Sequence, residues 1–416
     1  MEIITSRRNF LRRVGIFAFS LTNITGCDAM SGKKPIGEFG KTFDYLQNPE
    51  LRQKENGDAL ITINNALFGS AEFRALTWRN IRFVDCDFAS SYAIKLKGSE
   101  DLQFEGCRFA GVLGFGKMTR VQFAKCAGVG KLNMIGDAGS TNVRFEDCKF
   151  QGDDADQNHF GALGTEGETE FTRCQFKYMS IYGDTKLTIR DCEFEDVDCP
   201  IDGATGGSEV LIENSKLRGK FDMRPSTLLS LTIRKTIINS IDMSDATIKG
   251  DVVLESLDAG YINAGVRSVR NFTIRKSTVR GLNDKVFIVG ADSTGQFLAE
   301  DVIFGRGNVG IGAGRPLTEN EWSAAPANKI IAFRNCTLPM LDASWLESQH
   351  FLLEKCELQQ ADISNCRIGK LEIKNTHISE KIDLSNTRVH EQDLTGMLAD
   401  KGRKEKLDGT NVKLPG

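Results

Sequence analysis

One eight-residue phrase recurs along most of the chain, and it limits the fold more than any other feature of the 416 residues. The phrase alternates apolar with polar residues, holds Cys at its sixth place and ends on Phe, most clearly at 81–88, 102–109, 143–150 and 187–194. Alternation with a period of two residues favours a β-strand over a helix. Repeats of a fixed length near twenty residues indicate a solenoid, in which each repeat forms one coil.

The place that holds Cys sets the number of coils. Aligned on it, the chain gives fourteen positions: Cys86, Cys107, Cys126, Cys148, Cys174, Cys192, Ser215, Thr236, Ser256, Ser277, Val302, Cys336, Cys356 and Thr376. Because each position stands for one turn of the solenoid, we expect about 14 coils between residues 57 and 390.

A shorter period of five residues lies within some coils. Over 356–378 each unit is small or apolar, polar, large and apolar, polar, polar, and 231–253 follow the same pattern. In these segments the sequence resembles the pentapeptide-repeat family, and elsewhere it is similar to the looser pectate-lyase-like β-helices. The resemblance implies an all-β chain folded as a right-handed parallel β-helix, with coils stacked about 4.8 Å apart.

Phenylalanine is the dominant aromatic residue, with 26 copies against 5 Tyr and 3 Trp. The repeat explains this excess, because inward positions on successive coils lie above one another. We expect two stacks of Phe, followed after residue 200 by Ile, Leu, Val and Met: Phe83, Phe104, Phe123, Phe145 and Phe171 in one, and Phe88, Phe109, Phe150, Phe176 and Phe194 in the other.

Most cysteines share one phase of the repeat, and we expect them to be buried thiols, since a small, weakly polar side chain suits a place between Phe layers. A zinc site or a disulfide framework is a weaker alternative, because there is no Cys-x-x-Cys pair and only 4 His. Cys199 is expected in a loop. On the outer surface, Lys235, Glu255, Lys276 and Asp301 are predicted to form a ladder of paired charges.

The first 26 residues favour an export signal. Arg7 and Arg8, followed by a short apolar run over 14–24, resemble a twin-arginine signal peptide. The segment that ends in Cys27 resembles a lipobox, which implies cleavage before Cys27 and attachment of lipid to its thiol. By family analogy, Asp28 favours retention at the inner membrane. Residues 27–56 then supply the lipidated Cys, a tether and an N-terminal cap.

The charge of the chain is close to balanced, with 53 Lys and Arg against 56 Asp and Glu and a formal net charge of −3. Removal of residues 1–26 takes away four Arg and one Glu, so the mature chain carries −6. This balance argues against a nucleic-acid partner. No motif of the chain predicts a cofactor or a metal centre.

Two insertions in the repeat are the places where a solenoid of this kind presents functional loops. The first follows Phe150 and contains four side chains with acid–base potential, Asp153, Asp154, Asp156 and His159. The run 152–154 resembles the paired aspartates of β-helical polygalacturonases, which implies a glycan-cleaving site. That family's Gly-His-Gly and Arg-Ile-Lys motifs do not occur in this chain, so a solvated Asp-rich turn and a set of calcium ligands remain alternatives.

The second insertion follows Phe304 and is rich in Gly. A phosphate-binding loop is excluded, because no Lys-Ser or Lys-Thr pair follows the glycines. Arg306, Arg315 and Trp322 favour a partner-binding loop instead, since Arg and Trp are common anchors at interfaces. Residues 391–416 lose the repeat and are expected to form a C-terminal cap and tail, with a short helix over 391–398.

These observations predict a lipid-anchored periplasmic β-helix that binds rather than catalyses. A specific version is an immunity-type inhibitor of a toxin delivered to the periplasm, with a protein as partner and the membrane as anchor. The alternative is a protein that binds or degrades a polysaccharide through the loop from Asp153 to His159. A spacer with no specific ligand is a third hypothesis.

Overall fold

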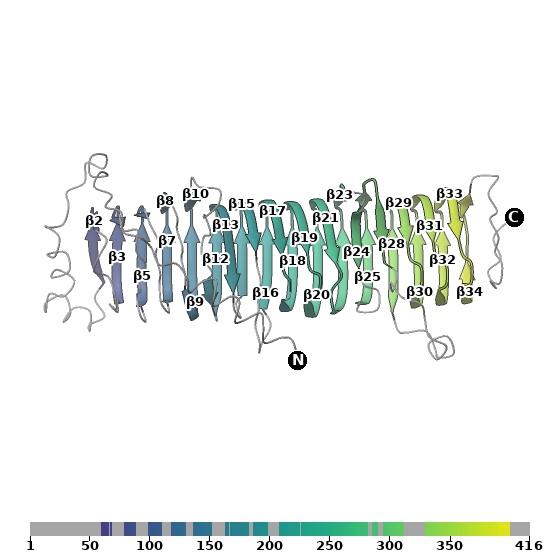
Figure 1. Cartoon of the computed structure of the whole chain (residues 1–416), viewed down its shortest axis with the longest axis horizontal. Coiled ribbons are helices and arrows are strands. Elements are labelled where there is room, and N and C mark those ends of the chain that lie inside the picture. The colour runs from purple at the N-terminus through teal and green to yellow at the C-terminus, as the bar shows by residue number, and fades with distance from the viewer. Residues whose placement is uncertain are drawn as a thin grey trace, which may run out of the picture. The chain divides into compact units, whose positions relative to one another are not determined.

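The computed structural model describes residues 60–399 except for the segments 66, 69–78, 89–98, 110–117, 130–135, 152–162, 166, 183–185, 199–207, 225, 282–284, 290–293 and 312–328. Within these residues the regular structure is entirely β, with no helix. All strand pairings are parallel, and each strand pairs with its counterparts one coil earlier and one coil later. The chain is therefore a parallel β-solenoid, as its repeat predicts (Figure 1).

Two stacks of strands run along the solenoid, and we call them face 1 and face 2. Face 1 consists of β1 (Ile61–Asn64), β3 (Arg79–Val84), β5 (Ser99–Glu105), β7 (Met118–Ala124), β9 (Gly136–Glu146), β12 (Glu168–Thr172), β14 (Lys186–Arg190), β16 (Ser208–Glu213), β18 (Thr227–Arg234), β20 (Thr247–Glu255), β22 (Ser268–Arg275), β25 (Thr294–Glu300), β28 (Ile330–Arg334), β30 (Glu347–Glu354), β32 (Arg367–Lys374) and β34 (Arg388–Asp393).

Face 2 follows face 1 around each coil. It consists of β2 (Leu67–Phe68), β4 (Asp87–Phe88), β6 (Arg108–Phe109), β8 (Ala127–Val129), β10 (Lys149–Gln151), β13 (Gln175–Tyr182), β15 (Glu193–Asp198), β17 (Lys216–Asp222), β19 (Ile237–Asp242), β21 (Asp258–Ala264), β23 (Thr278–Val279), β24 (Lys285–Val289), β26 (Ile303–Phe304), β27 (Asn308–Gly310), β29 (Thr337–Asp342), β31 (Glu357–Asp362), β33 (His377–Asp383) and β35 (Leu398–Ala399). The short strand β11 (Leu163–Thr165) pairs with β9 and β13.

The number of coils differs from the predicted fourteen. Within the described residues, fifteen successive pairings join the sixteen strands of face 1. The two additional coils lie at the ends, at β1 and at β34. Neither coil has Cys, Ser, Thr or Val at the aligned place, since Ala66 and Met397 stand there, and the alignment on that place missed both.

Stacked Phe rings fill the first half of the core, as predicted. On face 1 the rings of Phe83 and Phe104 are parallel within 8° with centroids 5.0 Å apart, and the stack continues through Phe123, Phe145 and Phe171. The stack on face 2 has one gap, because Gly128 aligns between Phe109 and Phe150. These two rings nevertheless approach to 6.4 Å, so they lean over the glycine.

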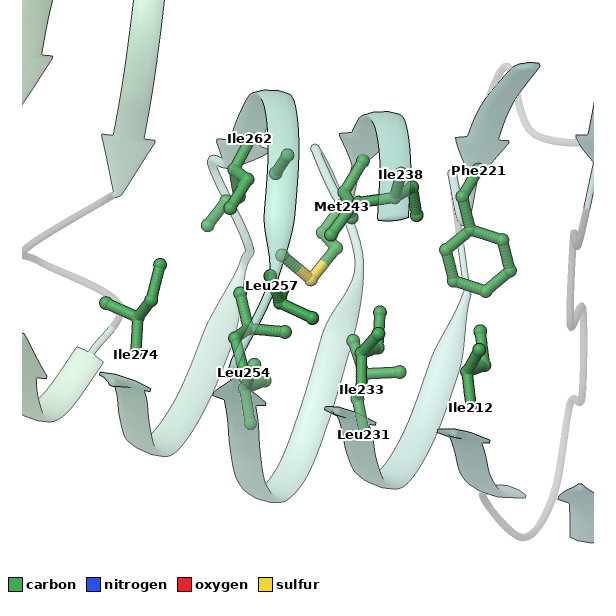
Figure 2. Packing of buried hydrophobic residues seen from close by; sticks show 14 of the residues in the cluster. Ile212, Phe221, Leu231, Ile233, Ile238, Met243, Leu254, Leu257, Ile262 and Ile274 are labelled. Atoms are coloured by element: carbon green, nitrogen blue, oxygen red, sulfur yellow. The ribbon is translucent and has the colours of Figure 1, made fainter. Parts of the chain in front are cut away.

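Aliphatic side chains replace the Phe stacks in the coils that follow residue 200, as predicted, but Phe rings contact one another again farther along, at Phe272, Phe287, Phe297, Phe304 and Phe333. Ile212, Ile233, Leu254 and Ile274 occupy one register position on four successive strands and are fully buried. Figure 2 shows these residues pointing into the interior between the two faces. Burial of apolar surface at about 25 cal/mol per Å² is the main force that holds the coils together.

The corner between face 1 and face 2 is the same in every coil. One residue there adopts a left-handed backbone conformation, with φ near 50–60° at Asn65, Asp85, Lys235 and Asn375 among others. Asn and Asp tolerate this conformation better than other non-glycine residues. The next residue in the chain points inward and occupies the place of the repeat that holds Cys.

The thiols at that place are buried, as predicted, and they also donate hydrogen bonds. Cys107 Sγ lies 3.4 Å from the carbonyl oxygen of Phe83 one coil earlier and 3.5 Å from that of Glu105. Ser215 and Thr236 replace Cys and donate in the same way, to Glu213 at 2.8 Å and to Arg234 at 2.9 Å. In most coils the place therefore holds a small side chain with a hydrogen to donate, whereas Leu257, Val302 and Met397 occupy it without a donor.

A second recurrent turn ends the strands of face 2 in the later coils. The carboxylate of an Asp accepts a hydrogen bond from the backbone N–H two residues on, at 3.1 Å between Asp242 and Ser244 and at 2.9 Å between Asp362 and Ser364. The side chain thus replaces a backbone acceptor at a tight turn. Its sequence signal is Asp, one apolar residue, then Ser.

Three sequence predictions need correction. Leu257, not Ser256, occupies the inward place in its coil, and Ser256 is the left-handed corner residue. The predicted ladder of Lys235, Glu255, Lys276 and Asp301 mixes two columns, because Glu255 ends a strand whereas the other three lie at the corner. The short helix expected over 391–398 is absent, since strands β34 and β35 and the turn between them continue the solenoid to Ala399.

Candidate functional site

Most of the sequence-predicted site residues lie outside the part of the chain that the structure describes. These are the acid–base candidates Asp153, Asp154, Asp156 and His159, the interface candidates Arg315 and Trp322, the export residues Arg7 and Arg8, and the lipidation residue Cys27 with its neighbour Asp28. Arg306 is the one predicted binding residue that falls within the described residues.

Arg306 lies in a bend of the solenoid rather than in the insertion where it was expected. The bend joins β26 to β27, and β27 pairs with both β24 and β29, so residues 305–310 belong to the coil. The undescribed segment begins only at residue 312. Arg306 is exposed, and it stands within a few residues of the strand from which that segment leaves.

Two large apolar side chains are exposed on the strands next to the bend that holds Arg306. Ile303, on β26, is 56% exposed, and Met340, on β29, is 39% exposed. Their strands are neighbours on face 2, where Ile303 pairs with Thr337 and Asn308 pairs with Met340. We call Ile303, Arg306 and Met340 the Arg306 surface. Ile303 and Met340 were not predicted from the sequence as surface residues. Each is an apolar residue at an outward position of the repeat, and that pattern could have identified them.

A shallow hollow of ≈ 370 Å³ follows the corner between the two faces over coils β13 to β19. Its walls are corner residues and the first residues of face-2 strands, with three inward residues between them: Arg173, Gln175, Asp191, Glu193, Asn214, Lys216, Lys235 and Ile237, and the buried Cys174, Cys192 and Ser215. Several of these polar groups are already engaged, since Arg173 binds Asp147 at 2.7 Å and Arg218 binds Glu193 at 2.7 Å. The hydrogen bond from Arg218 lowers the pKa of Glu193.

The outer edge of face 1 carries charges of alternating sign. The last residue of nine successive strands reads Arg190, Glu213, Arg234, Glu255, Arg275, Glu300, Arg334, Glu354 and Lys374, and each is in register with the next. The guanidinium of Arg234 lies 3.0 Å from Glu213, and that of Arg275 lies 3.1 Å from Glu255. We call this column the charge ladder. Its five cations and four anions nearly neutralise one another, so it offers a ligand a net charge of only +1.

The carboxylates of the described residues that have strongly shifted pKa values are stabilised as anions. Burial raises the pKa of Asp222, but hydrogen bonds from Arg224 and Lys220 outweigh it and lower the pKa to about 2. Lys220 also contacts Asp242 at 2.9 Å, which closes a cluster of two cations and two anions. Hydrogen bonds from Lys374, Lys370 and His350 lower the pKa of Glu372 to about 2. A general acid needs a raised pKa, so these groups stabilise the fold instead.

Among the described residues, no three His, Cys, Asp or Glu side chains are placed to hold a metal ion. No helix in the same part of the chain is long and apolar enough to cross a membrane. A comparison with models of known protein families finds no match, and comparisons with curated proteins and with solved structures find none either.

Proposed function

We propose that this chain is a lipid-anchored periplasmic β-solenoid that binds a protein partner and does not catalyse a reaction. The specific form of the proposal is an immunity-type inhibitor that holds a toxin delivered to the periplasm. The Arg306 surface carries the proposal, because it combines an exposed arginine with two exposed apolar side chains on neighbouring strands. Arg315 and Trp322 follow in the adjoining insertion and extend the same anchor chemistry.

The export part of the proposal rests on the sequence. Arg7 and Arg8 support a twin-arginine signal, Cys27 supports a lipid anchor, and Asp28 supports the inner membrane. Several acyl chains on one Cys hold a protein firmly, whereas a single chain does so only marginally. The Asp-x-Ser turns of the later coils support a relationship to pentapeptide repeats, which we propose for the region around 356–378.

The experiment compares two matched variants of the tagged chain, cross-linked in the native envelope and purified. Ile303→Asp places a charge on the Arg306 surface, and Ile237→Asp does the same at another exposed isoleucine of face 2, which is 47% exposed. We expect a cross-linked protein that Ile237→Asp retains and Ile303→Asp loses. If no protein is recovered, or if both variants retain it equally, binding through this surface is wrong. Cell fractionation and labelling with a fatty acid test the anchor separately.

Polysaccharide binding is the second candidate, and the corner hollow supports it. Its polar side chains repeat from coil to coil, which suits a ligand that itself repeats along the solenoid. The loop with Asp153, Asp154, Asp156 and His159 would supply cleavage in this version. Glycan arrays and oligouronide assays test it, with Lys216→Ala in the hollow and Asp154→Asn in the loop. An array that stays blank for the unmodified chain removes this candidate.

A further inference from the structure

Nine free thiols lie in the core of the described solenoid, and all are buried. Six of them, Cys86, Cys107, Cys126, Cys148, Cys174 and Cys192, stand one above another on consecutive coils and are 0–3% exposed. Thiols that are buried this completely do not meet a dissolved oxidant in the folded chain. In the unfolded chain the same thiols are open to it.

Each thiol in this column donates its hydrogen to a backbone carbonyl oxygen. Cys86, Cys126 and Cys148 donate across to the coil before them, to the carbonyl oxygens of Ile63 at 3.4 Å, Phe104 at 3.3 Å and Phe123 at 3.3 Å. Cys174 and Cys192 donate to carbonyl oxygens two residues earlier, at 3.3 Å and 3.0 Å. A disulfide removes both hydrogens, so it deprives two coils of their donor at once.

Geometry also restricts which thiols a disulfide can join without breaking the stack. Coils are about 4.8 Å apart, and coils two steps apart are about 10 Å apart. A disulfide needs Cα atoms closer than about 7 Å. Only cysteines on neighbouring coils can therefore be bridged while the coils remain stacked. Six thiols allow about 15 complete pairings, and only one of these joins neighbours throughout.

We propose that the thiol column makes this chain dependent on folding before it meets an oxidant. Stacking of the coils buries the thiols and protects them from oxidation. Oxidation of the unfolded chain instead forms disulfides between cysteines that do not lie on neighbouring coils, and these prevent the coils from stacking. The effect of oxidation on refolding does not depend on the proposed function. Its relevance in the cell rests on the proposed export, because the twin-arginine route carries chains that are already folded.

The chemistry of the test is a two-electron oxidation. Diamide, a diazene dicarboxamide, takes two electrons and two protons from two thiols, so an S–S bond forms while its N=N double bond becomes an N–N single bond with two new N–H bonds. The full chain is used with Cys27→Ser and Cys199→Ser, which leaves the nine described thiols. One sample is treated with diamide while native, and another in denaturant before dilution into native buffer.

We expect the native sample to keep all nine thiols, counted by alkylation and mass spectrometry after denaturation, and to keep its β circular dichroism. The sample oxidised while unfolded should recover the native spectrum at least about tenfold less than a reduced control. The six thiols of the column alone allow about 15 complete pairings, of which one joins neighbours throughout, and the other three thiols add further pairings. Dithiothreitol should restore that recovery. Equal recovery with and without diamide, or loss of thiols in the native sample, would overturn the inference.

A variant with Ser at the nine positions supplies the matched control, since Ser215 and Ser277 already perform the same role in this chain. It should refold equally with and without diamide. If this variant refolds poorly in both conditions, the nine-thiol chain still provides the test. Recovery of its native spectrum on addition of dithiothreitol then supports the inference, and failure to recover contradicts it. Fractionation and labelling of the anchor are separate measurements, so a failed export proposal leaves this result intact.

Discussion

Cys107 donates its thiol hydrogen to the carbonyl oxygen of Phe83, 3.4 Å away on the preceding coil. This contact links the two features that the sequence repeats most faithfully, the Phe and the Cys. It also explains why Ser or Thr replaces Cys in four later coils, at Ser215, Thr236, Ser277 and Thr376, although Leu257, Val302 and Met397 occupy the place without a donor. A hydroxyl donates to the same carbonyls, and a methyl group does not.

The first prediction concerns this donor. Cys107→Ala should lower the free energy of unfolding by about 1–2 kcal/mol, because it leaves a small cavity and removes a buried donor. Cys107→Ser keeps the donor and should cost less. Urea unfolding followed by circular dichroism measures both. An alanine variant as stable as the serine variant would show that only size matters at this place.

The second prediction concerns the charge ladder. Glu255→Lys places a cation between Arg234 and Arg275, which makes a row of three, and should lower the unfolding free energy by about 1 kcal/mol at low salt. Raising the salt to 1 M should recover much of the loss, since screening shortens the reach of exposed charges. Glu255→Gln is the control and should show a smaller loss with little salt dependence. Thermal unfolding at two salt concentrations gives both values.

A third prediction follows from the Glu372 cluster. Its folded-state pKa, about 2, lies below the ordinary 4.5, so the anion stabilises the fold at neutral pH. That stabilisation, about 1–3 kcal/mol, should be complete above about pH 5 and fade as the pH falls toward 2. Glu372→Gln should be less stable than the parent at pH 7 and equal to it near pH 2. Urea unfolding midpoints of the parent and of Glu372→Gln, measured from pH 7 to pH 2, test this expectation. A difference in midpoint that stays the same at every pH would contradict it.

The fourth prediction compares two glycines on either side of Arg306, Gly305 in the bend and Gly310 at the end of β27. A Cβ on Gly305 would lie 2.0 Å from the carbonyl oxygen of Arg280, whereas a Cβ on Gly310 meets nothing within 4 Å. Gly305→Ala should therefore cost about 1–3 kcal/mol through overpacking. Gly310→Ala should change stability little. Equal effects would mean that the coil yields at Gly305 more easily than its backbone contact implies.

Sequence periodicity was sufficient to predict the solenoid, the Phe stacks and the buried thiols. These features follow from a local rule, since a side chain with a period of two residues either enters the core or avoids it. Register was predicted less well. Ser256 resembles the Ser at the inward place, yet Leu257 is buried there, because the left-handed corner needs one residue before the inward one.

The ends and the outer surface were harder to predict. Met397 is an inward residue of the final described coil, but it lacks the thiol or hydroxyl donor that most other coils carry, so the alignment of the repeat ended before it. The exposed Ile303 and Met340 follow the same alternation as their neighbours, with an apolar residue at a polar place. Periodicity identifies inward positions and says nothing of which outward positions bind a partner.

The alternating signs of the charge ladder also restrict how this chain can change in length. Loss of the single coil that ends in Glu255 would set Arg234 against Arg275, whereas loss of two consecutive coils keeps opposite charges in register. The same holds for duplication. Along Arg190 to Lys374 the natural unit of growth is thus a pair of coils, about forty residues, although the backbone repeats every coil.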